Sequence, residues 1–175
     1  PPRDRPSAAG QQSRRESAKP KPMSVDAIYR WQNEELVEID PAAVSSTPMT
    51  VADSWLVSAG SVVGLALHRQ RFLDAVPAAE RETAESFFAA AVAALPRAGI
   101  WFPRVELRGA EFFLRLRANP ELRRSATAVT VQDDDPRTQP SVKGPDLVAM
   151  GELQAAARDR GADEAILLTD EGYVI

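Results

Sequence analysis

Apolar and polar residues alternate along much of the chain between residues 24 and 65, and this period of two is typical of β-strands. Two hairpins are predicted, one from residues 27–39 around a Gln-Asn turn and one from residues 54–65 around Ala59-Gly60. A Pro- and Ser-rich stretch, residues 40–48, separates them and is expected to be a linker. The first part of the folded chain is therefore expected to be β-structure.

After residue 65 the apolar positions recur at the spacing of an α-helix. Residues 65–76 are expected to form a short helix, which Pro77 ends. The clearest helix is predicted over residues 78–95, where acidic residues occupy the first turns and are favoured by the helix dipole. One apolar stripe runs along this second helix and contains Ala84, Phe87, Phe88, Ala91, Val92 and Leu95.

Strands are predicted again after the second helix. Residues 99–107 and 110–117 are expected to pair through a turn at Arg108-Gly109. Pro103 cannot donate to a ladder, so it directs the first of these strands to a sheet edge or to an irregular position. Residues 126–132 predict one further strand.

The last part of the chain begins with a loop, residues 133–145, and continues as a helix. Asp146 is expected to cap this helix and Gly161 to end it, and residues 164–175 predict a closing hairpin. The inner face of the helix is expected to contain Leu147, Met150, Leu153 and Ala157. Because helices and mostly antiparallel strands are mixed, the predicted class is α+β, or α/β in the broad sense.

Composition excludes several classes of function. The chain has 175 residues, 44% of them hydrophobic, and a formal net charge of −4, which gives no reason to expect nucleic acid or an anionic membrane as a partner. The absence of cysteine excludes a disulfide framework, a zinc knuckle and a thiol nucleophile. No apolar run approaches the roughly 20 residues needed to span a bilayer, and no signal peptide is visible, so a soluble, cytoplasmic protein is expected.

Lys143 is unusual because the chain uses arginine almost everywhere else. Of 21 basic residues three are lysines, and the other two, Lys19 and Lys21, lie in a Pro- and Ser-rich basic head that is expected to be disordered. A lysine just before a helix lies where the dipole disfavours the ammonium form, and a neutral amine can form a Schiff base with a carbonyl cofactor. Arginine cannot do this. An ordinary surface lysine remains the alternative.

Other polar residues give weaker signals. His68 is the single histidine, which excludes a multi-histidine metal site and weakens any Ser-His-Asp interpretation; with Arg71 it shares one helical face. The carboxylates at 133–135 fit either a cation site or, as we prefer, a solvated turn, so no metal is predicted. Four arginines in the predicted strands could clamp a carboxylate or cover a solvated sheet face: Arg104, Arg108, Arg115 and Arg117.

Three segments resemble one family. "RGADEAILLTDEGYVI" resembles the hairpin of the fold-type IV pyridoxal-phosphate enzymes, or class IV aminotransferases, in which a Schiff-base lysine stands just before the preceding helix. "LHRQRF" resembles the family's H-x-x-R-F helix, and "VELRGAEFFLRLR" resembles a strand near which the family recognises substrate carboxylates. Members include branched-chain and D-amino-acid aminotransferases and aminodeoxychorismate lyase, and the last two resemble this chain most in the spacing from Lys143 to Gly161.

The resemblance implies roles for individual residues. Lys143 would be the Schiff-base lysine and the base that moves the α-proton, Arg71 would hold the phosphate of pyridoxal phosphate, and His68 would position the helix. Arg104 and Arg108 would contact a substrate carboxylate. The implied organisation is a leader (1–23), a small α+β domain (24–132), and an interdomain loop with the start of a larger cofactor domain (133–175). Family members pair as homodimers, to which Trp31, Trp55 and Trp101 could contribute unless they are core residues.

The resemblance also leaves alternatives open. The chain ends where the family next places the glutamate that pairs with the pyridine nitrogen, so the isolated chain is expected to be inactive or severely impaired. The family's G-D-G-x-F-E turn is replaced by "VADSWLVSAGSV", which favours a lyase-like branch. The expected function is amino-acid transamination; the alternatives are aminodeoxychorismate lyase activity giving 4-aminobenzoate and pyruvate, an inactive truncated homologue, or an unrelated small-molecule-binding module.

Overall fold

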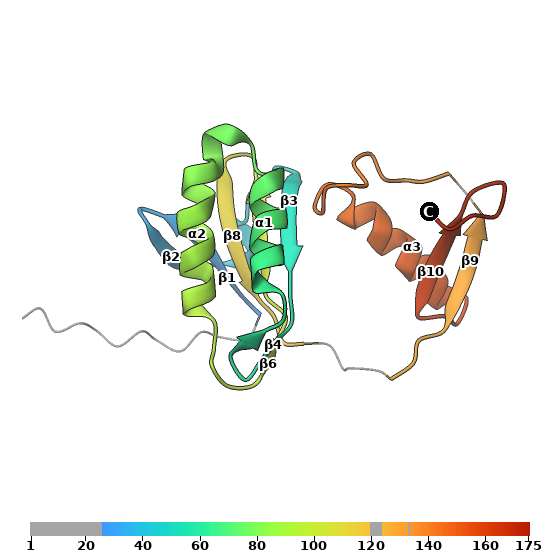
Figure 1. Ribbon diagram of the computed structural model, residues 1–175, viewed down its shortest axis with the longest axis horizontal. Helices are drawn as coiled ribbons and strands as arrows, with labels where there is room; N and C mark the ends of the chain where they lie inside the picture. Colours follow the sequence, from blue (N-terminus) through green and yellow to red (C-terminus); the bar gives the residue numbers. More distant parts are fainter. Residues whose placement is uncertain (1–25, 120–123, 133) are drawn as a thin grey trace, which may run out of the picture.

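The computed structural model describes residues 26–119, 124–132 and 134–175. They form an N-terminal region, up to residue 119, and a C-terminal region, from residue 124 (Figure 1). The expected leader at 1–23 lies outside the described residues.

An antiparallel five-stranded sheet in the order β2-β1-β8-β7-β3 forms the centre of the N-terminal region. The predicted hairpin of β1 and β2 turns through Asn33 and Glu34, which both have positive φ (50° and 61°). In this order β7 is an interior strand and β3 is an edge strand. The strands are β1 (Ala27–Gln32), β2 (Glu35–Ile39), β3 (Met49–Ser54), β7 (Arg104–Arg108) and β8 (Glu111–Leu116).

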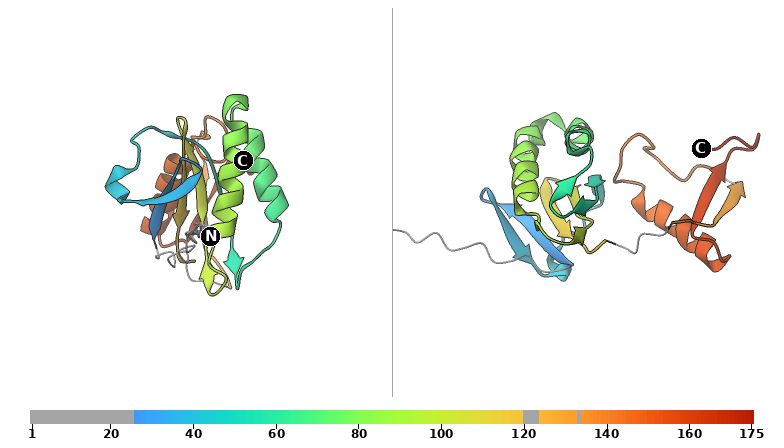
Figure 2. Two further views of the ribbon diagram at one scale, coloured as in Figure 1. Left: turned by 90° about the vertical axis from the view of Figure 1, so that its left-hand side faces the viewer. Right: turned by 60° about the horizontal axis from the view of Figure 1, so that its bottom comes forward.

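Two helices, α1 (Leu65–Ala75) and α2 (Arg81–Ala94), cover one face of this sheet (Figure 2). Their apolar stripes meet the sheet in an aromatic cluster, in which the ring of Phe87 lies 5.2 Å from that of Phe112 and 6.3 Å from that of Phe72. These three side chains are at most 2% exposed. Burying such rings is worth roughly 1.5–3 kcal/mol each, so this layer contributes several kcal/mol to the stability of the region.

Short elements complete the N-terminal region. The predicted turn at Ala59-Gly60 has positive φ at both residues, and it joins two short strands of a small three-stranded sheet. The short elements are η1 (Pro41–Ala43), η2 (Ala78–Glu80), β4 (Val57–Ser58), β5 (Ser61–Val62) and β6 (Ile100–Trp101). Pro103 separates β6 from β7, so it takes the irregular position rather than the edge position that the sequence also allowed.

The C-terminal region contains β9 (Ala128–Gln132), α3 (Leu147–Asp159) and β10 (Glu164–Leu168). The two strands pair in parallel, with Ala128 opposite Glu164 and Gln132 opposite Leu168. As predicted, α3 ends before Gly161, which has a positive φ of 78°. Within the described residues, no helix has the length and apolar character that a bilayer crossing requires.

The structure corrects several expectations. The segment after the Pro- and Ser-rich linker forms β3, which the sequence analysis did not predict. Residues 164–175 do not form a full hairpin, because β10 pairs with β9 and only the bridge between Leu168 and Val174 is antiparallel. β9, which was assigned to the small domain, bonds to β10, and we propose that the boundary between the regions lies before β9 rather than after residue 132.

Asp146 stands at the N-cap position of α3, as predicted, but its side chain does not cap the helix. Its carboxylate instead accepts hydrogen bonds from the amides of Thr138 and Gln139 and from the Thr138 hydroxyl, at 2.8–2.9 Å. These bonds lower the pKa of Asp146. Asp146 therefore closes the loop that carries Lys143 onto the start of α3.

Candidate functional site

Asp53 of β3 is the centre of a group of charged side chains between β3 and α1. The side chain is fully buried and faces α1, because it follows Val51 at the strand period of two and Val51 belongs to the core on the helix side. Its Oδ1 also accepts a 2.6 Å hydrogen bond from the amide of Ser54. Burial alone would raise the pKa of Asp53, but its hydrogen bonds and the nearby cations outweigh this and lower it.

Arg71 and His68 reach Asp53 from one face of α1. Arg71 donates from Nε to Oδ2 at 2.8 Å and from Nη2 to Oδ1 at 2.6 Å, which is a two-point contact. Nδ1 of His68 lies 3.1 Å from Oδ1. The hydrogen bond with Asp53 raises the pKa of Arg71. The predicted pairing of His68 with Arg71 on one helical face is confirmed, and both residues bind the same carboxylate.

Lys143 is held against the free edge of β3. The amide of Ala52 donates a 2.6 Å hydrogen bond to the carbonyl of Lys143. Gly144 follows with a φ of 146°, and a Cβ there would lie 2.8 Å from Cα of Val51 and 2.9 Å from the amide nitrogen of Ala52. The loop can therefore approach β3 this closely only because residue 144 has no side chain.

The amine of Lys143 lies 3.8 Å from Oδ1 of Asp53, and the side chain is 31% exposed. Burial lowers the pKa of Lys143, Asp53 opposes this, and the positive charges of Arg71, Arg117 and Arg104 lower it further. The direction agrees with the prediction. The causes are the burial and these neighbouring charges, whereas the prediction relied on the dipole of the following helix.

Lys143 and Arg71 line one cavity of about 260 Å³ between the two regions. Residues 140–144 and the start of α3 form its other walls. A neighbouring cavity of about 440 Å³ shares Arg71, Ser141 and Val142 with it. An amine, a guanidinium and the hydroxyl-bearing Ser141 thus line the smaller cavity together, which suits an anionic ligand that also carries a carbonyl group.

The opposite sheet face carries the predicted arginines, gathered around the fully buried Glu106 of β7. Arg104 and Arg108 donate from Nε to the two carboxylate oxygens at 2.7 and 2.8 Å, and Arg115 of β8 forms a third ion pair. Burial would raise the pKa of Glu106, but these arginines lower it below its ordinary value. The solvated sheet face that the sequence left open is therefore excluded for these three arginines.

Arg117, which follows β8, completes this group. Its guanidinium lies 5.2 Å from the centre of the Phe102 ring and donates to the Phe102 carbonyl at 3.2 Å. Burial, together with Arg104, lowers the pKa of Arg117 below its ordinary value. Four guanidinium groups thus gather near the carboxylate of Glu106, and two of them, Arg104 and Arg117, also act on Lys143.

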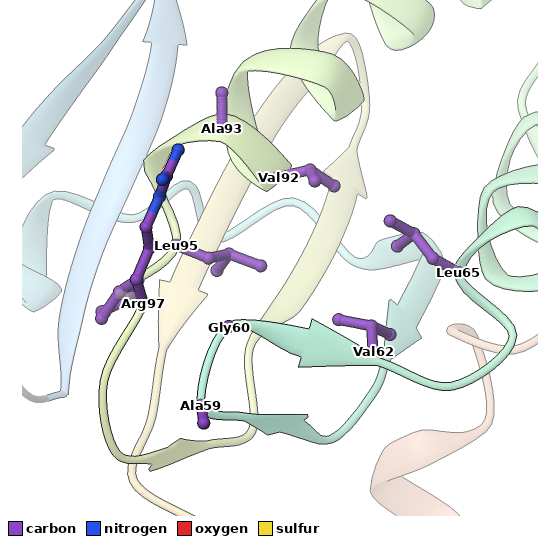
Figure 3. A pocket seen from close by; sticks show the side chains of 9 residues that line it. Ala59, Gly60, Val62, Leu65, Val92, Ala93, Leu95 and Arg97 are labelled. Atoms are coloured by element: carbon purple, nitrogen blue, oxygen red, sulfur yellow. The ribbon is translucent and has the colours of Figure 1, made fainter.

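A further cavity of about 400 Å³ lies between the end of α2 and the β4–β5 hairpin (Figure 3). Apolar side chains such as Val62, Leu65 and Val92 line it, and Arg97 is the one charged residue in its wall. It therefore lacks the groups that acid–base or nucleophilic chemistry needs.

No cluster of three or more metal-ligating acids or histidines occurs within the part of the chain that the structure describes. Asp135, one of the acids considered for a cation, makes a two-point contact with Arg137 at 2.8 Å. The first acid of that run, residue 133, lies outside the described residues.

A family model described as amino-transferase class IV matches residues 50–175. The chain belongs to the class IV aminotransferase family. The matched segment contains Asp53, Arg71, the arginine group and Lys143. The resemblance predicted from the sequence is thereby confirmed at the level of the family. No curated protein matches the chain.

Solved structures show the same fold at low identity. A fold IV-transaminase from Curtobacterium pusillum has a TM-score of 0.63 at 17% identity, with 85% of this chain and 65% of that one covered. A PLP-bound hypothetical aminotransferase from Mycobacterium tuberculosis gives 0.58, 16%, 85% and 64%. A putative 4-amino-4-deoxychorismate lyase gives 0.58, 18%, 78% and 60%. The chain thus spans less than two thirds of the length of each of these family structures.

Two acids of the site were missed by sequence reasoning. Asp53 stands in the stretch "VADSW", where a single carboxylate interrupts an apolar run, and Glu106 alternates with arginines in "RVELR". Both patterns are signals, because a lone carboxylate at a buried strand position needs cationic or donor partners.

Proposed function

We propose that this chain provides the reactive amine and the phosphate-binding arginine of a pyridoxal-phosphate-dependent enzyme that catalyses amino-acid transamination. The observation that most supports this is the shared cavity of Lys143 and Arg71, which come from different regions of the molecule. The PLP-bound form of one structural relative supports the choice of cofactor.

The donor set of the cavity suits this cofactor. Arg71 carries a permanent positive charge for a phosphate, and Asp53 uses its Nε and Nη2 but not Nη1. Lys143 offers an amine whose pKa is lowered, as a reaction with an aldehyde requires. Ser141 adds a hydroxyl to the same wall. Lys143 and Arg71 would therefore hold the cofactor, and when bound it would supply an electron sink for the amino-acid substrate.

The chain's own residues would then divide the work. Nζ of Lys143 would hold and move a proton, which needs an amine that is not permanently protonated. Burial and the three arginines favour the neutral amine, and Asp53 opposes them. Arg71 would bind and orient the anionic end of the ligand, and Asp53 would fix the direction of the guanidinium.

Arg104 and Arg108 remain our candidates for the substrate carboxylate. Glu106 occupies Nε of both, and Nη1 of Arg108 donates to the Thr47 carbonyl at 3.1 Å. Neither arginine lines the cavity of Lys143 and Arg71, and the positive charge of Arg104 contributes to the lowered pKa of Lys143. The excess of guanidinium groups over carboxylates would attract an anionic substrate to this face.

A second candidate, aminodeoxychorismate lyase, is favoured by the structural likeness to a putative lyase and by the "VADSWLVSAGSV" segment. The two activities separate in one assay. The protein that carries this chain is incubated with aminodeoxychorismate in the absence of any 2-oxo acid acceptor. Pyruvate release would support the lyase, whereas turnover that depends on an added 2-oxo acid would support the transaminase.

We further propose a homodimer as the working assembly. Trp55 is a core residue, 2% exposed, and drops out as an interface candidate. Trp31 and Trp101 pack against the core while remaining partly accessible, so they stay candidates. Sedimentation velocity on the unchanged protein and on a Trp31→Ala variant measures the expected dimer and its weakening.

Trapping tests the proposed function directly. The protein is incubated with pyridoxal phosphate and reduced with borohydride, and its peptides are mapped by mass. We expect the label on Lys143 and its loss in Lys143→Arg, while Lys19→Arg serves as the matched control and keeps the label. A chain that is unlabelled at Lys143 contradicts the proposal.

A further inference from the structure

We propose that Asp53 is a positioning residue that holds the amine of Lys143 and the guanidinium of Arg71 next to one another through one shared carboxylate. This deepens the proposed function and rests on it for the catalytic meaning of Lys143. The contacts themselves are independent of any cofactor.

The geometry of Asp53 makes this sharing possible. Oδ2 accepts from Nε of Arg71, while Oδ1 accepts from Nη2 of Arg71 and lies 3.8 Å from Nζ of Lys143. Arg71 and Lys143 therefore meet at the same oxygen. The carboxylate cannot turn away easily, because Oδ1 also accepts from the amide of Ser54 and β3 holds the backbone in the sheet.

Without Asp53, two cations from different regions would approach each other with no charge between them. Both cations lie beside the same oxygen of Asp53, and like charges in such a position repel. Within a partly buried site the free energy of this repulsion is several times larger than in water. Arg71 is anchored in α1, and the backbone of Lys143 is anchored on Ala52, the residue before Asp53. The acid therefore stands where the two regions contact, and it offsets the repulsion between the groups that they contribute.

The charge on Lys143 should respond to both neighbours in opposite directions. Asp53 favours the ammonium form, and Arg71 favours the neutral amine. His68 contacts the same carboxylate at 3.1 Å. The charged groups that act on the amine are Asp53 from β3 and Arg71 from α1, together with Arg104 from β7 and Arg117 after β8 on the other sheet face. Asp146, from the start of α3, lines the same cavity.

Competitive labelling measures this response without any cofactor. The chain is treated with a trace of acetic anhydride at a series of pH values, and the label on Lys143 is compared with that on Lys19 and Lys21 by peptide mass. In Asp53→Asn we expect the midpoint of the Lys143 profile to move to lower pH. The labelling rate at neutral pH should rise at least about threefold, since each unit by which a pKa falls raises the neutral fraction about tenfold. In Arg71→Gln the midpoint should move to higher pH.

Arg69→Gln is the matched control, because Arg69 lies on α1, half-exposed, and pairs with Glu85 rather than Asp53; its profile should not move. If Asp53→Asn does not fold, Arg71→Gln decides alone, with slower labelling of Lys143 as the supporting result. An unchanged profile overturns the proposal. A shift of the Lys143 midpoint to higher pH in Asp53→Asn, toward the ordinary lysine value, also overturns it. That result would mean that Asp53 only keeps the cavity closed to water. Borohydride trapping could fail while the Lys143 midpoint still moves to lower pH in Asp53→Asn and to higher pH in Arg71→Gln. That result would overturn the proposed function and leave the role of Asp53 standing.

Discussion

The two regions of the molecule differ in the size of their hydrophobic cores. In the N-terminal region, 17 buried apolar residues form one cluster between the sheet and the two helices. In the described C-terminal region, the buried apolar residues are Ala157, Ala162 and Leu167, while Tyr173 and Val174 are each 72% exposed. The N-terminal region can therefore fold on its own contacts, whereas α3, β9 and β10 have little interior to hold them.

The candidate catalytic and binding residues come from both of these regions. The well-packed region holds Asp53 and Arg71 on a rigid strand and helix, and the sparsely packed region presents Lys143 from a loop. The loop is placed by its contact with Ala52 and by the missing side chain of Gly144. The reactive amine is thus positioned by the core of the other region.

The largest effect should come from the aromatic core. Phe112→Ala removes a ring that contacts Phe72 and Phe87, and we expect the free energy of unfolding of the N-terminal region to fall by about 3–5 kcal/mol. Val63, which is 94% exposed, provides the control, and Val63→Ala should change it by less than about 0.5 kcal/mol. Equal losses in denaturant titrations would contradict this description of the core.

Glu106→Gln should have the next largest effect, because it leaves three partly buried guanidinium groups without their carboxylate. We expect a loss of about 3 kcal/mol. The unchanged protein should also depend on pH. The folded pKa of Glu106 is lowered, so its stabilisation is present above the unfolded pKa of about 4.3 and is lost as the pH falls through the folded value.

Urea titrations between neutral and acidic pH check this sign. Glu106→Gln should remove that part of the acid-induced loss. Glu111→Gln, in the adjoining strand and half-exposed in its pair with Arg30, is the control. A variant that keeps the full pH slope would show that other acids cause it.

Gly144→Ala should separate the two regions while leaving the core intact. Its Cβ would meet the backbone of Val51 and Ala52, and the positive φ adds strain, so the docked state should lose about 1–3 kcal/mol. We expect faster hydrogen exchange at the Ala52 amide and an unchanged denaturation midpoint for the N-terminal region. Continued protection of that amide in Gly144→Ala would contradict the conclusion that Gly144 allows the Lys143 loop to contact β3.

Gly151→Ala should give the smallest effect, and one of opposite sign. Gly151 lies inside α3, and a Cβ there meets nothing within 4 Å. The helix should gain about 0.5–1 kcal/mol, seen as slower hydrogen exchange in α3 alone. Because both variants add one methyl group to the same region, Gly151→Ala also controls for Gly144→Ala.

The sequence predicted those helices and hairpins that are specified by signals within their own residues. The β1–β2 hairpin, α1, α2 and α3 carry their own turn or helix signals, and all four were found. By contrast β3 was missed, because it follows a Pro- and Ser-rich stretch and contains buried polar residues, Asp53 and Ser54. The parallel pairing of β9 with β10 was also missed, since it joins segments more than 30 residues apart, and no local signal specifies such a partner.

The residues of the candidate site also differ in whether the sequence could indicate them. Lys143 was singled out by its rarity and Arg71 by a family motif, and both line the cavity of about 260 Å³. Neither signal indicated that one buried acid would lie between them, or that Glu106 would bind three of the predicted arginines.

The sequence by itself determined which residue types were available: one lysine beyond the basic head, one histidine, no cysteine, and helices and strands with readable periods. Only the tertiary structure decided which charges share a site, because the Asp53 contacts join β3, α1 and the loop before α3. A period reports the face on which a residue lies, whereas a pKa depends on the burial and on the charges that other segments bring within a few ångströms.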